Sequence, residues 1–237
     1  MDFVEIKRQL LNFLFPIECS VCGKEDVWLC HDCLLKLALT RTQSCFFCEK
    51  INDSGATCSH CAADHRLDGV FVCADYANPT IASLIKKLKY SFARELSEVL
   101  AAIAHRYWLE LAADSGLKKI DPSGLIIVPI PLHKKRYNWR GFNQAELIAK
   151  SLADRLGIPC QNLLQRIRHN TPQAKLSGPE RRQNLHGCFA VRENNLRGKK
   201  ILLIDDVATT GSTLIEAAEV LKAAGARQVW ALVIAKG

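Results

Sequence analysis

Apolar and polar residues beyond position 66 form blocks that predict strands and helices in turn. Short apolar runs predict strands at 70–73, 125–131, 163–166, 188–191, 201–204 and 228–235. Apolar residues that recur every three or four positions predict helices at 81–90, 96–113, 140–156 and 214–221. Strands that alternate with helices predict an α/β fold, with a mostly parallel sheet flanked by helices and right-handed crossovers.

The first 66 residues follow a different pattern. Residues 3–15 have apolar positions on one side only, which predicts an amphipathic helix that packs on the body of the protein. Attachment of this helix to a membrane is a lesser alternative. Residues 19–61 then contain many cysteines and few large apolar residues, unlike the rest of the chain. We therefore expect two domains, at 1–66 and 67–237.

Eight cysteines of the first domain form four C-x-x-C pairs, a spacing typical of metal ligands. Each pair places two sulfurs on one side of a tetrahedral zinc ion, so four pairs predict two closed, structural zinc sites. Reduced cysteines without metal are the alternative. The spacing leaves open whether the pairs combine in chain order or crosswise, and we favour chain order. The predicted ligands are Cys19, Cys22, Cys30, Cys33, Cys45, Cys48, Cys58 and Cys61.

The apolar run 201–204 leads directly into two acids, Asp205 and Asp206, and a small loop of threonine, glycine and serine follows. Ligands of parallel sheets bind beyond the carboxyl ends of the strands. The backbone N–H groups of a small loop before a helix can hold a phosphate, and carboxylates can accept hydrogen bonds from a sugar diol. This pattern indicates a phosphorylated sugar as ligand. An Asp-capped surface turn is the bland alternative.

A second basic region follows the predicted strand 125–131, with Lys134, Lys135, Arg136 and Arg140 close together. Arg140 and Gly141 open the next predicted helix, and this arrangement favours a second phosphate site at the same sheet edge, because a guanidinium binds pyrophosphate as a fork. A merely solvated basic loop is the alternative. Residues 169–187 are polar and predict a lid or binding loop, or else a disordered excursion.

Composition narrows the class of protein. The chain has 237 residues and a formal net charge of +8, which suits anionic ligands. No run reaches the roughly 18 apolar residues of a membrane span, and no secretory segment precedes the cysteines. We therefore expect a cytoplasmic protein without disulfides.

The stretch I-D-D-V-x-T-T-G-x-T resembles the signature of type I phosphoribosyltransferases, apart from Ala208, where many members carry a larger aliphatic residue. V-P-I-P-L-H…R-G-F-N-Q-A, T-P-Q…R-R-x-N-L-x-G-x-F and the cysteine pairs extend the resemblance over nearly the whole chain. Together they resemble the ComF family, also called GntX or competence-protein F homologues. The resemblance implies a type I phosphoribosyltransferase fold behind a double zinc ribbon, and a link to DNA uptake or use of DNA as a nutrient.

The resemblance also implies 5-phosphoribosyl-1-pyrophosphate (PRPP) as ligand or substrate, with Mg²⁺ bound to it. Asp205 and Asp206 would be the catalytic acids that hold the ribose hydroxyls, and a flexible loop would contribute Gln173, Arg181 and Asn184. The PRPP-binding residues would be Lys89, Arg140, Gly141, Ala208, Thr209, Thr210, Gly211, Ser212 and Thr213.

Two functions remain open at this point. The protein could be an enzyme that transfers the phosphoribosyl group to an unknown base or amine. It could instead sense PRPP or a nucleotide and bind single-stranded DNA or a DNA-uptake helicase. Exposed aromatic residues such as Phe47 and Trp139 would suit strand binding. The sequence identifies neither the acceptor nor the oligomeric state.

Overall fold

The computed structural model describes residues 17–52, 54–90, 93–114, 117, 120, 123–168, 187–192 and 195–237. The amphipathic helix predicted at 3–15 lies outside the described residues. Among the described residues, no helix has the length and hydrophobicity needed to cross a membrane.

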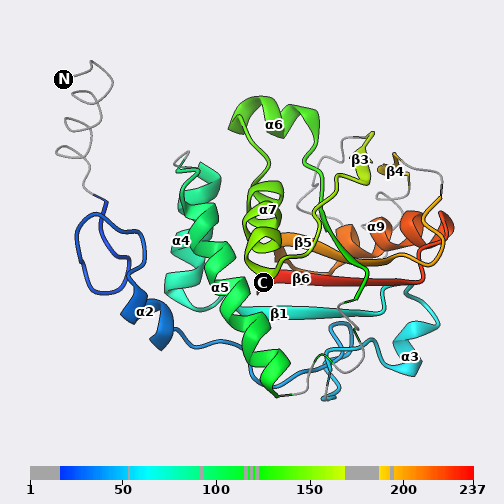
Figure 1. The fold of residues 1–237 in the computed structure, drawn as a ribbon, viewed down its shortest axis with the longest axis horizontal. Coiled ribbons are helices and arrows are strands. Elements are labelled where there is room, and N and C mark those ends of the chain that lie inside the picture. Colours follow the sequence, from blue (N-terminus) through cyan, green and yellow to red (C-terminus); the bar gives the residue numbers. More distant parts are fainter. Residues whose placement is uncertain are drawn as a thin grey trace.

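A four-stranded parallel sheet lies at the centre of the molecule (Figure 1). Its strand order is β1-β6-β5-β2, and all three neighbouring pairs are parallel. The strands are β1 (Gly69–Asp75), β2 (Leu125–Pro129), β5 (Lys200–Ala208) and β6 (Gln228–Lys236). The predicted α/β class and parallel sheet are therefore confirmed.

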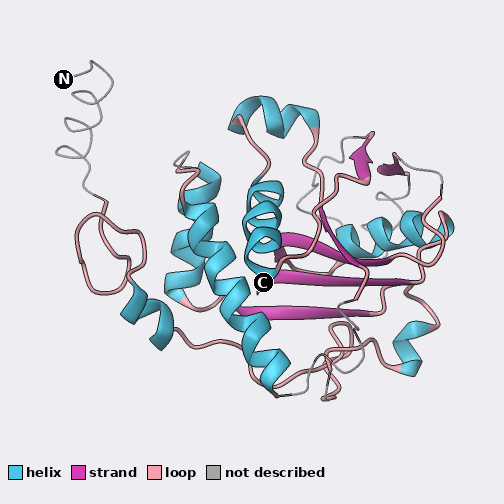
Figure 2. Ribbon diagram, in the orientation of Figure 1, coloured by secondary structure: helices cyan, strands magenta, loops and turns pink. Residues whose placement is uncertain are grey.

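Helices cover both faces of this sheet (Figure 2). Alternate strand residues belong to two separate apolar clusters, as expected when successive side chains point to opposite faces. One cluster includes residues of α4 (Pro79–Tyr90), α5 (Leu96–Ala113) and α7 (Gln144–Leu156). The other includes residues of α9 (Ser212–Ala223). Burial on both faces explains why the strand sequences are continuous apolar runs.

Two predicted strands lie outside the main sheet. β3 (Leu164–Arg166) and β4 (Phe189–Val191) pair with each other, antiparallel, in a separate two-stranded sheet. Each strand has three residues, and only the first of the three is buried. The predicted strands at 163–166 and 188–191 are therefore present, but they lie outside the parallel sheet, whose central strands are buried on both faces.

The basic region after β2 is a helix, α6 (Lys134–Arg140), and not a loop. Its first turn is capped by His133, whose ring accepts a hydrogen bond from the Lys135 N–H. Gly141 ends the helix in the left-handed conformation, with φ at +77°. α7 begins only after Asn143, which caps it by accepting from the Ala145 N–H. The prediction that Arg140 opens this helix is therefore wrong, because glycine and a capping asparagine separate two helices there.

The cysteine-rich segment packs against this body and contains two short helices, α2 (His31–Lys36) and α3 (Ser59–Ala62). α2 lies beside α4 and α5 (Figure 1). Arg106 of α5 donates hydrogen bonds to the carbonyl oxygens of Leu34 and Leu37, the latter at 3.0 Å. The chain enters the central sheet at β1, and a domain boundary between 66 and 67 stays a prediction.

Candidate functional site

Asp205 and Asp206 lie near the carboxyl end of β5, where the strand leaves the core. The side chain of Asp206 is almost completely buried, and its Oδ1 lies 3.1 Å from the Nζ of Lys89 at the end of α4. Asp205 Oδ1 accepts a hydrogen bond of 2.9 Å from the backbone N–H of Asp206. The sheet thus presents two adjacent carboxylates, of which one is paired with a lysine.

The surroundings of Asp205 change its ionisation. Burial of the Asp205 carboxyl and the neighbouring negative charge of Asp206 raise the pKa of Asp205 to about 7. The Asp206 N–H, Lys89 and Arg166 act in the opposite direction and only partly compensate. Asp205 therefore changes charge near neutral pH, which is common for carboxyl groups in functional sites.

A pocket of about 420 Å³ opens in front of these acids. Basic residues converge on it from three elements besides β5: Lys89 from α4, Arg136 and Arg140 from α6, and Arg166 from β3. Thr213 of α9 and the exposed ring of Trp139 also line it. Four cations around two carboxylates suit a ligand with several negative charges and a polar, uncharged part.

Several buried polar atoms at this pocket have no hydrogen-bond partner among the described residues. They are Asp206 Oδ2, Arg140 Nε and Arg166 Nε. Arg140 is 7% exposed and donates one hydrogen bond, of 2.5 Å, to Gln144 Oε1. Burial lowers the pKa of Arg140, and the charge of Asp206 acts against this shift. Buried polar atoms in proteins are normally satisfied, so these atoms indicate where a ligand would bind.

The segment 208–213, which we call the 208–213 loop, runs from the last residue of β5 into the first two residues of α9. Gly211 has φ at +73° and directly precedes the helix. Thr209 and Thr210 are exposed, and the hydroxyls of Thr210 and Ser212 lie 2.6 Å apart. The loop therefore presents hydroxyls at a helix N-terminus, which favours anions.

The structure brings five predicted site residues together at the pocket, namely Lys89, Arg140, Asp205, Asp206 and Thr213. Ala208, Thr209, Thr210, Gly211 and Ser212 lie on the adjoining 208–213 loop, and Gly141 ends α6 without lining the pocket. Gln173, Arg181 and Asn184 lie outside the described residues. The assigned roles stay predictions.

Sequence reasoning missed Arg166 as a pocket residue. It belongs to no motif and was predicted only as the end of a strand. Burial lowers its pKa, while the charge of Asp205 is one of the factors that favour its charged form. The sequence carried no signal for this role, because β3 belongs to the separate antiparallel pair and not to the parallel sheet whose strand ends hold sites.

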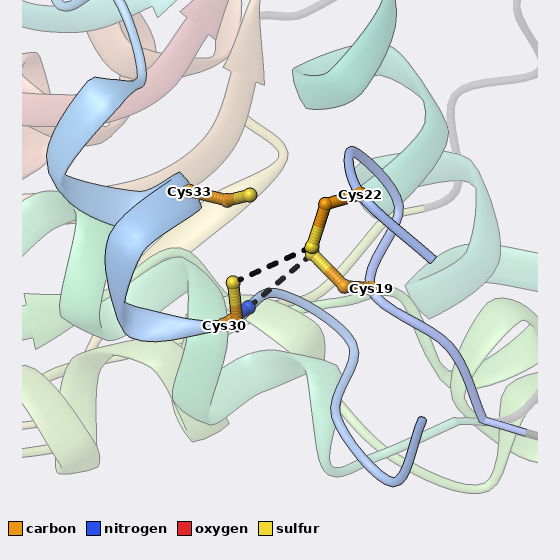
Figure 3. A group of neighbouring side chains, drawn as sticks. All are labelled: Cys19, Cys22, Cys30 and Cys33. Carbon is orange, nitrogen blue, oxygen red and sulfur yellow. Dashed lines mark hydrogen bonds between the residues drawn. The ribbon is translucent and has the colours of Figure 1, made fainter. Parts of the chain in front are cut away.

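The eight cysteines of the N-terminal segment form two clusters in chain order, as predicted. Figure 3 shows the first, in which the side chains of Cys19, Cys22, Cys30 and Cys33 converge. Cys45, Cys48, Cys58 and Cys61 form the second, and within each cluster all sulfurs lie within 4.8 Å of one another. Crosswise pairing is thus excluded.

The donor set of both clusters fits a tetrahedral metal ion. A zinc–sulfur bond of about 2.3 Å implies sulfurs about 3.8 Å apart, and the Cys22–Cys30 and Cys48–Cys58 sulfurs are 3.7 Å and 3.6 Å apart. Burial of the Cys19 sulfur opposes ionisation, but backbone N–H groups such as that of Cys30 favour the thiolate and lower its pKa to about 6. The same balance lowers the pKa of Cys45 to about 6. Each cluster thus contains a thiolate suited to metal binding.

Comparison with known proteins places the chain among phosphoribosyltransferase-domain proteins. A family model described as "Phosphoribosyl transferase domain" matches residues 143–237. Competence protein F of Haemophilus influenzae is 30% identical over 223 residues, which cover 86% of this chain and 95% of the relative. Competence protein ComFC of Bacillus subtilis is 32% identical over 203 residues, 84% of this chain and 79% of the relative.

Escherichia coli K12 has a relative called DNA utilization protein YhgH, 32% identical over 225 residues, 86% of this chain and 96% of the relative. Among solved structures, the match to the glutamine PRPP amidotransferase of B. subtilis covers 46% of this chain and 22% of the amidotransferase chain. Its TM-score of 0.31 and identity of 19% are too low to support an argument. The curated relatives match almost end to end, and the chain belongs to the ComF family, as a phosphoribosyltransferase-domain protein with two N-terminal four-cysteine clusters.

Proposed function

We propose that this protein binds PRPP in the pocket in front of Asp205 and Asp206 and transfers its phosphoribosyl group. One observation carries the proposal: two carboxylates and four basic side chains from separate elements converge on one pocket beside the 208–213 loop. PRPP carries a diol between a phosphate and a pyrophosphate, and so needs both kinds of group. The matched phosphoribosyl transferase domain supports this choice of ligand.

Each part of PRPP has a matching part of the site. Asp205 and Asp206 accept hydrogen bonds from the ribose 2′- and 3′-hydroxyls. The amides of the 208–213 loop and the hydroxyls of Thr209, Thr210 and Thr213 bind the 5′-phosphate at the start of α9. Lys89 and Arg140, with the backbone at Gly141, bind the pyrophosphate, and Arg136 and Arg166 add positive charge there.

Lys89 has two roles in this proposal. In the protein without ligand it neutralises Asp206 at 3.1 Å. When a ribose hydroxyl donates a hydrogen bond to the Asp206 carboxylate, the flexible lysine side chain turns toward the pyrophosphate. In the protein without ligand, the Lys89–Asp206 ion pair therefore replaces the contacts that the ligand makes.

The transfer itself depends on charge. As the bond between ribose C1 and pyrophosphate lengthens, positive charge develops on the ribose ring and negative charge on the pyrophosphate. Asp205 and Asp206 stabilise the first, and Lys89 and Arg140 stabilise the second. Mg²⁺, bound with PRPP, supplies further positive charge to the pyrophosphate. The acceptor is a base or an amine.

A calorimetric titration with PRPP and Mg²⁺ tests the assignment. Replacement of both acids, Asp205→Asn with Asp206→Asn, should abolish PRPP binding, while the far-ultraviolet circular dichroism stays unchanged. Unchanged affinity of the double variant contradicts the assignment. Pyrophosphate release, measured with a panel of bases and amines, then separates turnover from binding.

The relatives' names suggest a biological role. Proteins called competence protein F, competence protein ComFC and DNA utilization protein are similar over most of this chain. We infer a role in DNA uptake or in the use of nucleotides derived from DNA, in the cytoplasm. We also infer Zn²⁺ in both cysteine clusters, because closed four-sulfur sites of this geometry suit that ion.

A second candidate function is a PRPP or nucleotide sensor that binds single-stranded DNA or a DNA-uptake helicase. One observation favours strand binding: a groove of about 680 Å³ along α4 is lined by Lys86, Lys87, Lys89 and Tyr90, next to the pocket. Basic and aromatic side chains together suit single strands. Binding of single-stranded DNA that weakens steeply with salt, without pyrophosphate release, would support this candidate over the enzyme.

A further inference from the structure

The two cysteine clusters begin with turns of the same construction. In the first, the N–H of Gly23 donates to the carbonyl of Cys19 at 3.0 Å. In the second, the N–H of Glu49 donates to the carbonyl of Cys45 at 2.8 Å. Gly23 and Glu49 both have positive φ, 74° and 61°. This conformation is costly for a residue with a side chain, so the second turn keeps a strained glutamate where the first has glycine.

The strained glutamate of the second turn connects to the central sheet. Its carboxylate lies 2.7 Å from the Nζ of Lys236 at the end of β6. The same Nζ donates to the carbonyl of Phe46 at 3.3 Å and lies 4.9 Å from the centre of the Phe46 ring. Lys236 is the sheet partner of Ala208, the first residue of the 208–213 loop. The second turn is therefore tied to the strand beside that loop.

The ring of Phe46 lies against Gly211, the residue that precedes α9. Phe46 is 6% exposed and packs in the same apolar cluster as Ala208, the first residue of the loop, and Leu214, the residue after its end. A Cβ atom placed on Gly211 would lie 2.8 Å from Cε1 of Phe46 and 3.5 Å from Cε1 of Phe47. Two aromatic rings from between Cys45 and Cys48 thus form a wall against the glycine that starts α9.

The first cluster contacts a different part of the molecule. Its neighbours are α4 and α5, where Lys87 lies 5.4 Å from the ring of Trp28 and 3.4 Å from the hydroxyl of Ser20. α4 does not depend on this contact for its position, because four of its apolar side chains are fully buried in the core. These are Ile81, Leu84, Ile85 and Leu88.

We propose that the second four-cysteine cluster positions the 208–213 loop, with Phe46 as the positioning residue. Metal bound by Cys45 and Cys48 fixes the turn between them, and the turn holds the Phe46 ring against Gly211. Loss of metal from the second cluster releases the loop, whereas loss from the first does not. The effect on PRPP rests on the proposed function, but the effect on the loop does not.

The physical reason is preorganisation. A loop that binds phosphate through backbone amides must hold several N–H groups in one direction, and any freedom it has before binding reduces affinity. Gly211 has no side chain to restrict its own backbone, so neighbouring atoms must restrict it. Phe46 and Phe47 supply those atoms. A metal-fixed turn holds them more firmly than a chain end or a surface loop would.

Hydrogen exchange of the unliganded full-length protein tests the proposal directly. Phe46→Ala and Cys48→Ser should each speed amide exchange in residues 208–215 at least tenfold. Cys22→Ser is the matched control, since Cys22 and Cys48 are both the exposed second cysteine of a first pair. It should lose one metal equivalent, as Cys48→Ser does, and leave exchange of this loop within twofold. Affinity for PRPP should fall at least tenfold in Phe46→Ala and Cys48→Ser. In the control, Cys22→Ser, it should stay within twofold of that of the unmodified protein.

Two milder variants keep the proposal testable if Phe46→Ala or Cys48→Ser fails to fold. Phe46→Leu should give intermediate exchange and keep full metal content. Glu49→Gly should keep the second metal, because the first turn has glycine there, but lose the link to Lys236 and speed exchange severalfold. Loop exchange equal to that of the unmodified protein in all foldable second-cluster variants overturns the proposal. Absence of PRPP binding by the unmodified protein overturns the proposed function alone.

Discussion

The pH dependence of PRPP binding offers a sharp test of the acid pair. Burial and the charge of Asp206 raise the pKa of Asp205 to about 7. If PRPP binds to the ionised carboxylate, the competent fraction is roughly one eleventh at pH 6 and ten elevenths at pH 8, from a pKa of that size. We therefore expect affinity to rise about tenfold between these two values.

Asp205→Asn separates this effect from the titration of the ligand. An amide has the shape of the protonated carboxyl and does not ionise, so at pH 8 this variant should bind PRPP at least about tenfold more weakly than the unmodified protein does at the same pH. Its remaining pH dependence belongs to the phosphate groups of PRPP, whose second pKa lies near 6. Subtraction of this slope isolates the contribution of Asp205.

The assay is isothermal titration calorimetry with PRPP and Mg²⁺ at half-unit steps from pH 6 to pH 8. The range stops at pH 6 because at lower pH protons compete with the metal for the thiolate ligands. Parallel pH profiles for the two proteins would refute the reasoning, because they would show that the protonation of Asp205 has no effect on the ligand. A steeper profile for the unmodified protein supports it.

Three further outcomes follow from the same contacts. Lys89→Met leaves the buried Asp206 carboxylate without its cation and should lower the free energy of unfolding at pH 7.5 by about 1–3 kcal/mol, as measured with urea; an unchanged midpoint would contradict the ion pair. Gly157→Ala has open space and should cost about 1 kcal/mol for its positive φ alone. Gly211→Ala should cost clearly more in the same urea experiment, because its Cβ would meet the Phe46 ring, and equal losses would argue against that contact. A thiol-reactive mercurial should release two zinc ions per chain into a metallochromic indicator, and a single equivalent would show that one cluster is not a zinc site.

Features that depend on neighbouring residues of the chain were predicted correctly from the sequence. The run before Asp205 predicted a doubly buried strand, and β5 is the neighbour of two parallel strands in the sheet. The C-x-x-C spacing predicted metal clusters, and the structure assembles them in chain order. Both features depend on residues close together in the chain, so a local pattern contains the necessary information.

Features that depend on distant parts of the chain were not predictable. Nothing near Arg166 in the sequence indicates that the short strand β3 would turn away from the main sheet and bring this guanidinium to the pocket. The contact of Phe46 with Gly211 joins residues 165 positions apart, and no periodicity records it. The error at Arg140 was different. Gly141 and Asn143 are a helix stop and a helix cap, and these signals were present in the sequence.

The charges around the pocket are consistent with the proposed ligand. Lys89 forms an ion pair with Asp206, whereas Arg140 and Arg166 each keep a buried Nε without a hydrogen-bond partner among the described residues. A buried polar atom of a charged group without a hydrogen-bond partner destabilises the folded protein. Such atoms are expected where a bound ligand supplies the missing hydrogen bonds. The acids cannot provide that compensation alone, because Asp205 lies beside another carboxylate and tends to bind a proton near neutral pH. A ligand that offers hydroxyls to the acids and phosphate oxygens to the guanidinium groups satisfies both sides at once. This requirement links the sequence motif at 205–213 to basic residues contributed by α4, α6 and β3.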